Sequence, residues 1–306
     1  MTSSPQPIRA DAVRPRRRRG RRTLIPALAL APFVLFCLAM AAYPFAHVVR
    51  MAFSKVTLTA AGFQFEWTGF QNLAAVFADP LAARAVTNTV VFTLFAVVGS
   101  LVCGIIVAVL VDRAVAMLPI ARNVIIWPAI VTPVVVSVIW LLILSPTAGG
   151  LNKLLETFGL PAQTWLSSGP AAMASVVVVD VWHWTPIVFL FVYAALKAID
   201  TEILEAARVD GASESTIVFR IVLPLVMPAI AAVALIRMVM SIKVFDEMYV
   251  LTAGGPQGAT TLVSQRIQLW FFQDLSFGEA AAFGLLIIVA VILVFIVALI
   301  LRGVRK

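Results

Sequence analysis

The stretch EAARVDGASESTIVFRIVLP, residues 205–224, is a polar island in a chain that is otherwise strongly apolar. It holds three acidic residues, two arginines and a central glycine, whereas 62% of the 306 residues are hydrophobic and only 12% are charged. A soluble globular domain has about 45–50% apolar and about 25% charged residues. The composition therefore predicts an integral membrane protein, and the polar stretch predicts a segment outside the bilayer.

Six apolar segments surround this stretch, and each is long enough to cross a bilayer, because a spanning helix needs about 20 apolar residues. The expected spans are residues 24–46, 85–111, 123–144, 171–194, 225–248 and 280–301. Prolines within several of them predict kinks. Small residues at Ser100 and Gly104 predict a close helix contact for the second span. The sequence thus predicts an all-α membrane protein with six transmembrane helices in one domain, residues 24–302.

The basic residues predict how these spans are oriented. Eight of the 23 basic residues lie within the first 22 positions. If the N-terminus is inside, 16 basic residues lie in inner segments and only six in outer ones. Because inner segments carry the excess of Lys and Arg, both termini and the loop at residues 197–223 are predicted to be cytoplasmic. Residues 1–23 are expected to form a disordered basic tail, and residues 303–306 a second cytoplasmic tail.

The N-terminal run of arginines followed by apolar residues also fits a secretory signal. The apolar run is too long for a cleaved signal, and five further spans follow it. We therefore expect it to remain as the first span.

The loop between the fourth and fifth spans is predicted to contain two short helices. Asp200 can cap the first, Gly211 falls where a left-handed residue ends it, and Ser213 can cap the second. A helix of about ten residues is marginal alone in water, so the first needs a surface to pack against. Spacing alone leaves open whether that surface belongs to the chain's own spans or to a partner.

Three stretches carry a resemblance to a known family. Glu205, Ala206 and Ala207, followed by DGA at residues 210–212 and LP at residues 223–224, resemble the EAA loop of permease subunits in binding-protein-dependent ABC importers. FDEMYVLTAGGPQGATTL, residues 245–262, and ARNVIIWPAIVTPVVVSVIWLLILSPTAGGLN, residues 121–152, are similar to segments of the carbohydrate branch, the maltose and glycerol-phosphate type. The TAGGP element is more similar to the first of the two paired permeases.

This resemblance implies a coupling helix that sits in a cleft of a separate ATPase. The coupling residues it implies are Ile203, Leu204, Glu205, Ala206, Ala207, Asp210 and Gly211. It also implies a second homologous permease subunit, two ATPase subunits that use ATP and Mg, and an external solute-binding protein. The place of such a complex is the bacterial cytoplasmic membrane. A large residue at Gly211 is then expected to uncouple transport while leaving membrane insertion intact.

The chain lacks the motifs of an enzyme or a nucleotide-binding protein. It contains no GxxxxGK[ST], and none of its five lysines follows a glycine, so no P-loop is expected. Cys37 and Cys103 lie in apolar runs, and His47 and His183 lie in different spans, so neither a metal site nor catalytic residues are expected. The scattered basic residues also predict no nucleic-acid partner. We expect no cofactor bound by this chain, with ATP hydrolysis on a separate subunit.

Ionisable residues inside spans are costly and mark functional or paired positions. Asp180, His183 and Trp184 share one face of the fourth span, while Arg237 and Ser241 lie in the fifth. Asp180 and Arg237 lie at similar depth, so two interpretations stay open. They form a solute path, in which Trp184 stacks on sugar rings, or Asp180 and Arg237 form an ion pair between helices. A lone histidine such as His183 is more often a packing residue than a ligand.

The outer end of the fifth span offers two further expectations. Lys243 and Glu247 have i, i+4 spacing, which predicts a stabilising surface pair. Gly254, Gly255 and Pro256 lie in TAGGPQGATT, which cannot be regular helix. We expect them to contact the external binding protein or shape the outer gate, with a plain surface loop as the alternative.

The function predicted from these residues is that of the transmembrane permease of an ATP-driven importer for a sugar or sugar-like solute. A self-sufficient secondary carrier and, from a different class, an integral membrane enzyme are the alternatives. A disaccharide, a polyol, an amino sugar and glycerol phosphate all remain open as the solute.

Overall fold

The structure is a computed structural model that describes residues 24–113 and 118–304. The tail expected at residues 1–23 lies outside the described residues, and helix α13 continues to Val304. In order, the elements are α1 (Leu24–Ala52), β1 (Ser54–Thr59), β2 (Gly62–Trp67), α2 (Gln71–Ala78), α3 (Pro80–Arg113), α4 (Leu118–Ile130), α5 (Pro133–Ile143), α6 (Gly150–Thr157) and α7 (Gly169–Lys197). They continue with α8 (Thr201–Val209), α9 (Glu214–Ile217), η1 (Val218–Val222), α10 (Leu223–Ile242), α11 (Asp246–Thr252), α12 (Val263–Gln268), η2 (Leu269–Gln273) and α13 (Phe277–Val304).

Five helical segments of the described chain are long and apolar enough to cross a membrane. They are Leu28–Ala52, Pro80–Arg113, Gly169–Lys197, Glu214–Ile242 and Phe277–Val297. A sixth span is present if the bent pair Asn123–Ile130 and Pro133–Ile143 is taken as one. The chain therefore has five or six candidate spans, in agreement with a multi-pass membrane protein.

The third expected span, residues 123–144, is not one continuous helix. Its two parts are bent by 103° at a break between Ile130 and Pro133. Pro133 has no backbone N–H and disfavours helical geometry in the residue before it, and Thr132 is accordingly extended, with φ −67° and ψ 146°. The kink expected from the prolines is thus a full change of direction.

The described chain is mostly helical, in agreement with the predicted all-α class, but β1 and β2 add an antiparallel hairpin that was not expected. Its register pairs Ser54 with Trp67 at one end and Thr59 with Gly62 at the other. Gly62 supplies a left-handed φ of 106° at the turn. The Asn72 side chain fixes the base of the hairpin by donating to the carbonyl oxygens of Ala52 (3.0 Å) and Ser54 (2.8 Å).

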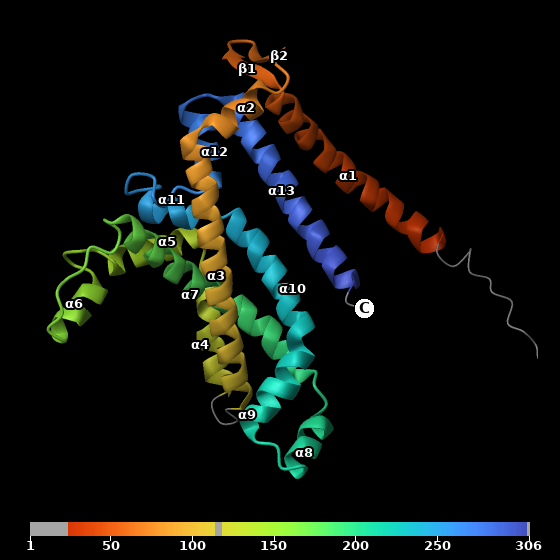
Figure 1. Cartoon of the computed structure of the whole chain (residues 1–306), viewed down its shortest axis with the longest axis vertical. Coiled ribbons are helices and arrows are strands. Elements are labelled where there is room, and N and C mark those ends of the chain that lie inside the picture. Colours follow the sequence, from red (N-terminus) through yellow and green to blue (C-terminus); the bar gives the residue numbers. More distant parts are fainter. Residues whose placement is uncertain (1–23, 114–117, 305–306) are drawn as a thin grey trace, which may run out of the picture. The chain divides into compact units, whose positions relative to one another are not determined.

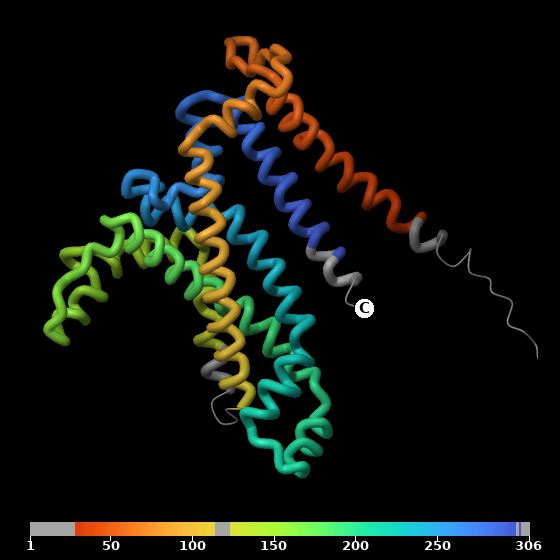
Figure 2. Tube along the Cα trace, viewed as in Figure 1, coloured from red at the N-terminus to blue at the C-terminus, as the bar shows by residue number. Residues whose placement is uncertain are grey.

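Helices α3, α7 and α10 pack against one another and form the centre of the molecule from Met51 onward (Figures 1 and 2). The α3 surface at this contact is made of small side chains: Ala96, Ser100, Gly104 and Ala108 are buried at four-residue spacing. A Cβ at Gly104 would lie 2.6 Å from Cβ of Val188 on α7. The close contact predicted for Ser100 and Gly104 is therefore present.

The fifth expected span, residues 225–248, ends earlier than predicted. Helix α10 stops at Ile242, and Lys243 caps it with φ −93° and ψ 2°. The chain then turns into the separate short helix α11, in which Glu247 is only 1% exposed. The surface pair expected between Lys243 and Glu247 is therefore wrong, because i, i+4 spacing brings side chains together only within one continuous helix.

Residues up to Arg50 form a unit separate from residues 51–306. Within this first unit, described from Leu24, apolar side chains such as Leu28, Phe33 and Phe36 are more than 60% exposed. Tyr43 and His47 pack edge to face, with ring centroids 4.8 Å apart. An apolar surface of this kind suits a helix in contact with lipid.

Replacing Gly104 by Val is expected to destabilise the protein by about 1–3 kcal/mol, because the new side chain overlaps Val188 and forces α3 away from α7. The measurement is the apparent Tm of the purified chain in detergent. Gly150→Val is the matched control, since a Cβ at Gly150 meets no atom within 4 Å. Equal Tm values for the two variants would contradict the close packing.

Candidate functional site

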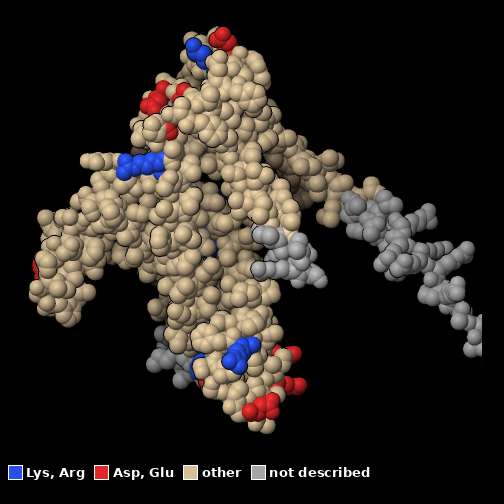
Figure 3. All heavy atoms as spheres, in the orientation of Figure 1, with Lys and Arg blue, Asp and Glu red and all other residues tan. Residues whose placement is uncertain are grey.

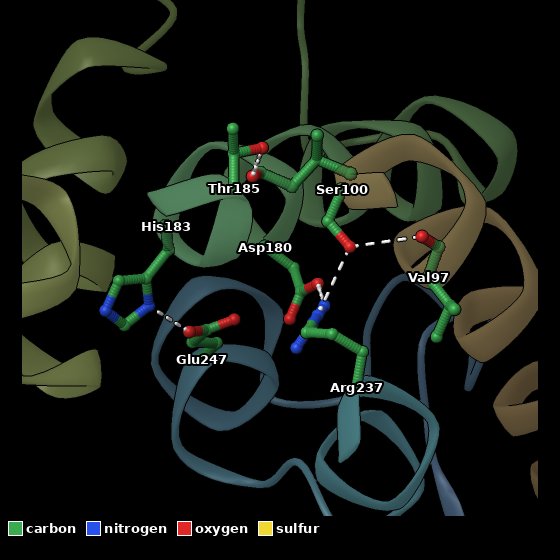
Figure 4. Close-up of polar contacts among 8 residues, drawn as sticks. Val97, Ser100, Asp180, His183, Thr185, Arg237 and Glu247 are labelled. Atoms are coloured by element: carbon green, nitrogen blue, oxygen red, sulfur yellow. Dashed lines mark hydrogen bonds and ion pairs between the residues drawn. The ribbon is translucent and has the colours of Figure 1, made fainter. Parts of the chain in front are cut away.

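A buried polar cluster lies where α3, α7 and α10 meet (Figure 4). Oδ1 of Asp180 on α7 accepts a hydrogen bond from Nη2 of Arg237 on α10, and the two groups form an ion pair. Nε of Arg237 also donates to Oγ of Ser100 on α3, at 3.2 Å. Both Asp180 and Arg237 are 0% exposed. A charge in an apolar layer is costly unless it is paired, so this contact makes both side chains tolerable within candidate spans.

The ion pair is the second of the two interpretations left open by the sequence, and it joins Asp180 on α7 to Arg237 on α10. Trp184, one turn beyond Asp180, is half-buried, and its ring centroid lies 5.4 Å from Cζ of Arg237. Ser241 is 0% exposed and lies one turn beyond Arg237 on α10. The structure thus gathers Asp180, Trp184 and Arg237 around one point.

His183 forms a second buried contact on the same helix. Its Nδ1 lies 2.6 Å from Oε1 of Glu247 on α11, and its Nε2 lies 3.1 Å from the carbonyl oxygen of Val131, in the break between α4 and α5. His183 and Glu247 are each 1% exposed. His183 is therefore a fully partnered histidine that ties α7 to two other elements.

Glu247 is a site residue that sequence reasoning missed. Its spacing from Lys243 pointed to the surface, whereas the end of α10 at Ile242 turns it inward. In FDEMYVLTAGGP, apolar residues lie on either side of the two acids, which is compatible with a buried position for one of them. That position could be predicted only if the end of the preceding helix were known. Val131 was equally hidden, because it takes part through its backbone carbonyl.

The loop at residues 197–223 forms two short helices, as predicted. Gly211 follows α8 with φ +81°; its N–H donates to the Arg208 carbonyl, and the N–H of Ala212 donates to that of Ala207, both at 3.0 Å. This is the paired arrangement that a left-handed glycine allows at a helix end. Ser213 caps α9 by accepting from the N–H of Thr216 at 3.3 Å. Asp200 stands at the N-cap of α8 without a side-chain hydrogen bond.

Helix α8 has one packed face and one exposed face. Leu204 and Ala207 pack against a core cluster that includes Leu196 and Ile217. The remaining predicted coupling residues, Ile203, Glu205, Ala206, Asp210 and Gly211, are exposed. Ile203 and Val209 are 43% and 87% exposed, so part of the exposed face is apolar.

Ion pairs hold the loop to the end of α3. Glu214 accepts from Arg113 at 2.7 Å and from Nε of Arg208 at 2.9 Å, while Lys197 pairs with Asp112 at 2.7 Å. Figure 3 shows acidic and basic side chains together at the end of the molecule that carries α8 and α9. These contacts border a hollow of about 410 Å³ between the loop and the helix ends. The charged groups thus join α8 to α3 and α9.

The segment after α11 is an irregular loop with many internal hydrogen bonds. Gly254 is buried with φ +85°, and a Cβ there would lie 2.6 Å from Oγ1 of Thr261. Gly255 and Pro256 follow at its half-buried turn. Nδ2 of Asn88 on α3 donates to the Gly258 and Thr261 carbonyl oxygens, both at 3.0 Å. The loop is therefore fixed in shape and anchored to α3.

Across residues 24–113 and 118–304, no group of three or more His, Cys, Asp or Glu side chains is placed to hold a metal ion. Cys37 and Cys103 are both exposed free thiols. The chemistry available in the described site is ion pairing, hydrogen bonding and aromatic stacking.

Comparison with known proteins gives consistent matches. Residues 116–305 match the profile of a family described as "Binding-protein-dependent transport system inner membrane component". The sulfoquinovosyl glycerol transport system permease protein SmoG of Agrobacterium fabrum is 31% identical over 261 residues, which cover 85% of this chain and 84% of that protein. The sn-glycerol-3-phosphate transport system permease protein UgpA of Brucella abortus biovar 1 is 28% identical over 270 residues, covering 88% and 91%.

Among solved structures, a similar chain occurs in a bacterial ABC transporter involved in the import of the acidic polysaccharide alginate. The two chains superpose with a TM-score of 0.80 at 23% identity, over 94% of this chain and 97% of that one. The likeness shows a shared fold.

Removing one partner of the buried ion pair is expected to destabilise the protein strongly. Asp180→Ala leaves the Arg237 guanidinium buried without its carboxylate, at a cost of about 3–5 kcal/mol. The double variant Asp180→Leu with Arg237→Met replaces both charges by apolar groups and is expected to recover most of this loss. The measurement is thermal unfolding in detergent.

The control for this prediction is Asp112→Ala, which breaks an ion pair with Lys197 that is partly exposed. It is expected to cost about 0–1 kcal/mol. A double variant as unstable as Asp180→Ala would contradict the role of the ion pair.

Proposed function

The chain belongs to the family of binding-protein-dependent transport system inner membrane components, the permease subunits of ABC importers, and we propose that it carries a sugar-like solute across the bacterial cytoplasmic membrane. The observation that carries this proposal is the similarity to SmoG, which extends over 85% of the chain. The solutes named for the two relatives are glycerol derivatives, and the solute named for the structural neighbour is a polysaccharide. A polyhydroxylated solute is the class they share.

The proposed solute path follows the polar face of α7 and α10. Trp184 is half-buried, and its aromatic ring is a suitable surface for the apolar face of a sugar. Asp180, His183, Arg237 and Ser241 are buried in the arrangement described here. Solute therefore reaches them only when the helices around them separate, as alternation between inward-open and outward-open arrangements requires.

Helix α8 is proposed to dock on a separate ATPase subunit. It has nine residues, so it is not stable alone in water, and its packed face uses only Leu204 and Ala207. The opposite face offers Ile203, Ala206 and Val209 at intervals of three residues, which places them in one stripe. An apolar stripe on an exposed helix suits a groove on a partner protein. ATP and Mg are then used on the partner, and this chain binds no cofactor.

The ion pairs around Glu214 give this docking a mechanical consequence. They tie α8 to Arg113 at the end of α3 and to α9, which continues into α10. A displacement of α8 is thus passed to α3 and α10, and through the Asp180–Arg237 pair to α7. Movement at the ATPase would in this way reach the proposed path.

The remaining partners follow from the family and from the charge distribution. The excess of basic residues in the predicted inner segments supports cytoplasmic termini and a cytoplasmic α8. The loop with Gly254, Gly255 and Pro256 would then lie on the outer side, where it contacts the solute-binding protein or the outer gate. A second homologous permease and two ATPase subunits complete the proposed transporter.

Reconstitution tests the function directly. Liposomes that contain the chain with its second permease and ATPase subunits are expected to take up solute only with ATP inside and binding protein outside. Uptake by this chain alone, driven by an ion gradient and indifferent to ATP, would instead identify a secondary carrier. The measurement is accumulation of radiolabelled solute.

A charge on the exposed stripe of α8 is expected to prevent ATPase docking. Ile203→Asp combined with Val209→Asp should weaken ATPase binding at least tenfold, which is about 1.4 kcal/mol, with little effect on folding because both side chains are exposed. The measurement is co-purification and ATPase affinity by titration. Leu160→Asp, at a residue that is 52% exposed outside the loop, is the matched control. Unchanged affinity in the double variant would contradict the docking site.

A further inference from the structure

His183 fastens two elements to α7 through the two nitrogens of one imidazole ring, and Figure 4 shows one of these contacts, between His183 and Glu247. Nε2 contacts the Val131 carbonyl in the break between α4 and α5, and Nδ1 contacts Oε1 of Glu247 on α11. His183 and Glu247 are each 1% exposed, so water does not compete at the contact between them. The ring is therefore a single fastening point for the broken span and for α11.

The two contacts together require a hydrogen between His183 and Glu247. A carbonyl oxygen only accepts, so Nε2 carries the hydrogen in its bond to Val131. Nδ1 and Oε1 lie 2.6 Å apart, and without a hydrogen between them two lone pairs would face each other. The hydrogen resides on Nδ1, facing a carboxylate, or on Oε1, facing a neutral ring. In both forms the pair has no net charge, which suits an apolar layer.

The elements that His183 fastens are bounded by irregular backbone. The α4–α5 bend leaves Val131 and Thr132 outside regular helix. Helix α11 is preceded by the non-helical residues 243–245 and ends at Ala253, whose φ is +46°. Helices α5 and α11 pack together through a cluster that includes Val136 and Met248. We call Pro133–Ile143 and Asp246–Thr252 the α5–α11 lid.

Four buried polar atoms of α7, α10 and α11 lack hydrogen-bond partners within the part of the chain that the structure describes. They are Oδ2 of Asp180, Nη1 of Arg237, Oγ of Ser241 and Oε2 of Glu247, all buried. A buried polar atom without a hydrogen bond is unfavourable, so this arrangement of the three helices carries a cost. The hydrogen bonds of His183 to Glu247 and to the Val131 carbonyl offset that cost.

We propose that His183 is a positioning residue that latches the α5–α11 lid to α7 through the hydrogen it shares with Glu247, and that the lid opens during transport. The charged groups of the elements around the latch are Glu247 and the exposed Asp246 on α11, Asp180 on α7 and Arg237 on α10, while α5 carries no charged residue. The role in transport rests on the proposed function, whereas the latch itself does not.

The test measures lid position in the full chain in lipid nanodiscs. Cys37 and Cys103 are first replaced by Ser, and spin labels are attached at Tyr249→Cys on α11 and Val178→Cys on α7, both exposed positions. The unmodified latch is expected to give one narrow distance distribution. His183→Ala is expected to move at least half of the distribution to longer distances.

Thr185→Val is the matched control on the same helix. The Thr185 hydroxyl donates only to the Val181 carbonyl of its own helix, so its loss leaves the lid in place. A narrow, unshifted distribution in His183→Ala would overturn the latch.

Glu247→Gln distinguishes a hydrogen-bonded latch from simple packing. The amide N–H of the glutamine donates to Nδ1, so this nearly isosteric variant is expected to keep the contact and the narrow distribution. Glu247→Leu offers no donor to Nδ1 and is expected to broaden the distances. Identical distributions in the two Glu247 variants would overturn the proposal, even if His183→Ala fails to fold.

The transport arm uses the assembled importer. Because His183→Ala leaves the lid unlatched, it is expected to lower solute uptake at least tenfold with unchanged ATPase binding, whereas Thr185→Val keeps its uptake. Undiminished uptake in His183→Ala would show that the latch has no part in transport. If the unmodified complex takes up no solute, the proposed function fails, and the spin-label distances still decide the latch.

Discussion

The ion pair between Asp180 and Arg237 is the contact on which the centre of this protein depends. Each charge lies in an otherwise apolar span, and each would be strongly unfavourable there without the other. The pair also fixes which faces of α7 and α10 meet, since only one rotation of each helix brings the two side chains together. The small residues of α3 then complete the contact, because Ser100 both packs closely and accepts from Arg237.

The second polar contact, between His183 and Glu247, has a different character. It joins elements that are short or interrupted, whereas the ion pair joins long continuous helices. Helix α7 therefore carries two polar contacts about one turn apart. Asp180 joins it to the long helix α10, and His183 joins it to short elements bounded by irregular backbone. A permease needs both kinds of contact, because it must hold its spans together in the bilayer while some of them move.

How much the sequence could predict depended on whether the decisive interaction was local. Gly211 was predictable because a left-handed helix end is set by a few neighbouring residues, and the Asp180–Arg237 pair was accessible because isolated charges at equal depth have few other partners. The position of Glu247 was not, since it depends on where α10 ends, and no glycine or proline marks Ile242. The hairpin was not predicted because its two strands have only six residues each. Their pairing depends on contacts between the strands, which the order of residues does not show directly.

The buried position of Arg237 has a consequence for how the protein is made. Helix α7 precedes α10 in the chain, so Asp180 is synthesised before Arg237 and can serve as its partner when α10 inserts. An arginine at the centre of a helix opposes insertion by about 2.5–3.5 kcal/mol. Asp180 on the earlier helix thus lowers the free-energy cost of inserting Arg237 on the later one. The order of the two residues along the chain therefore becomes an order of assembly.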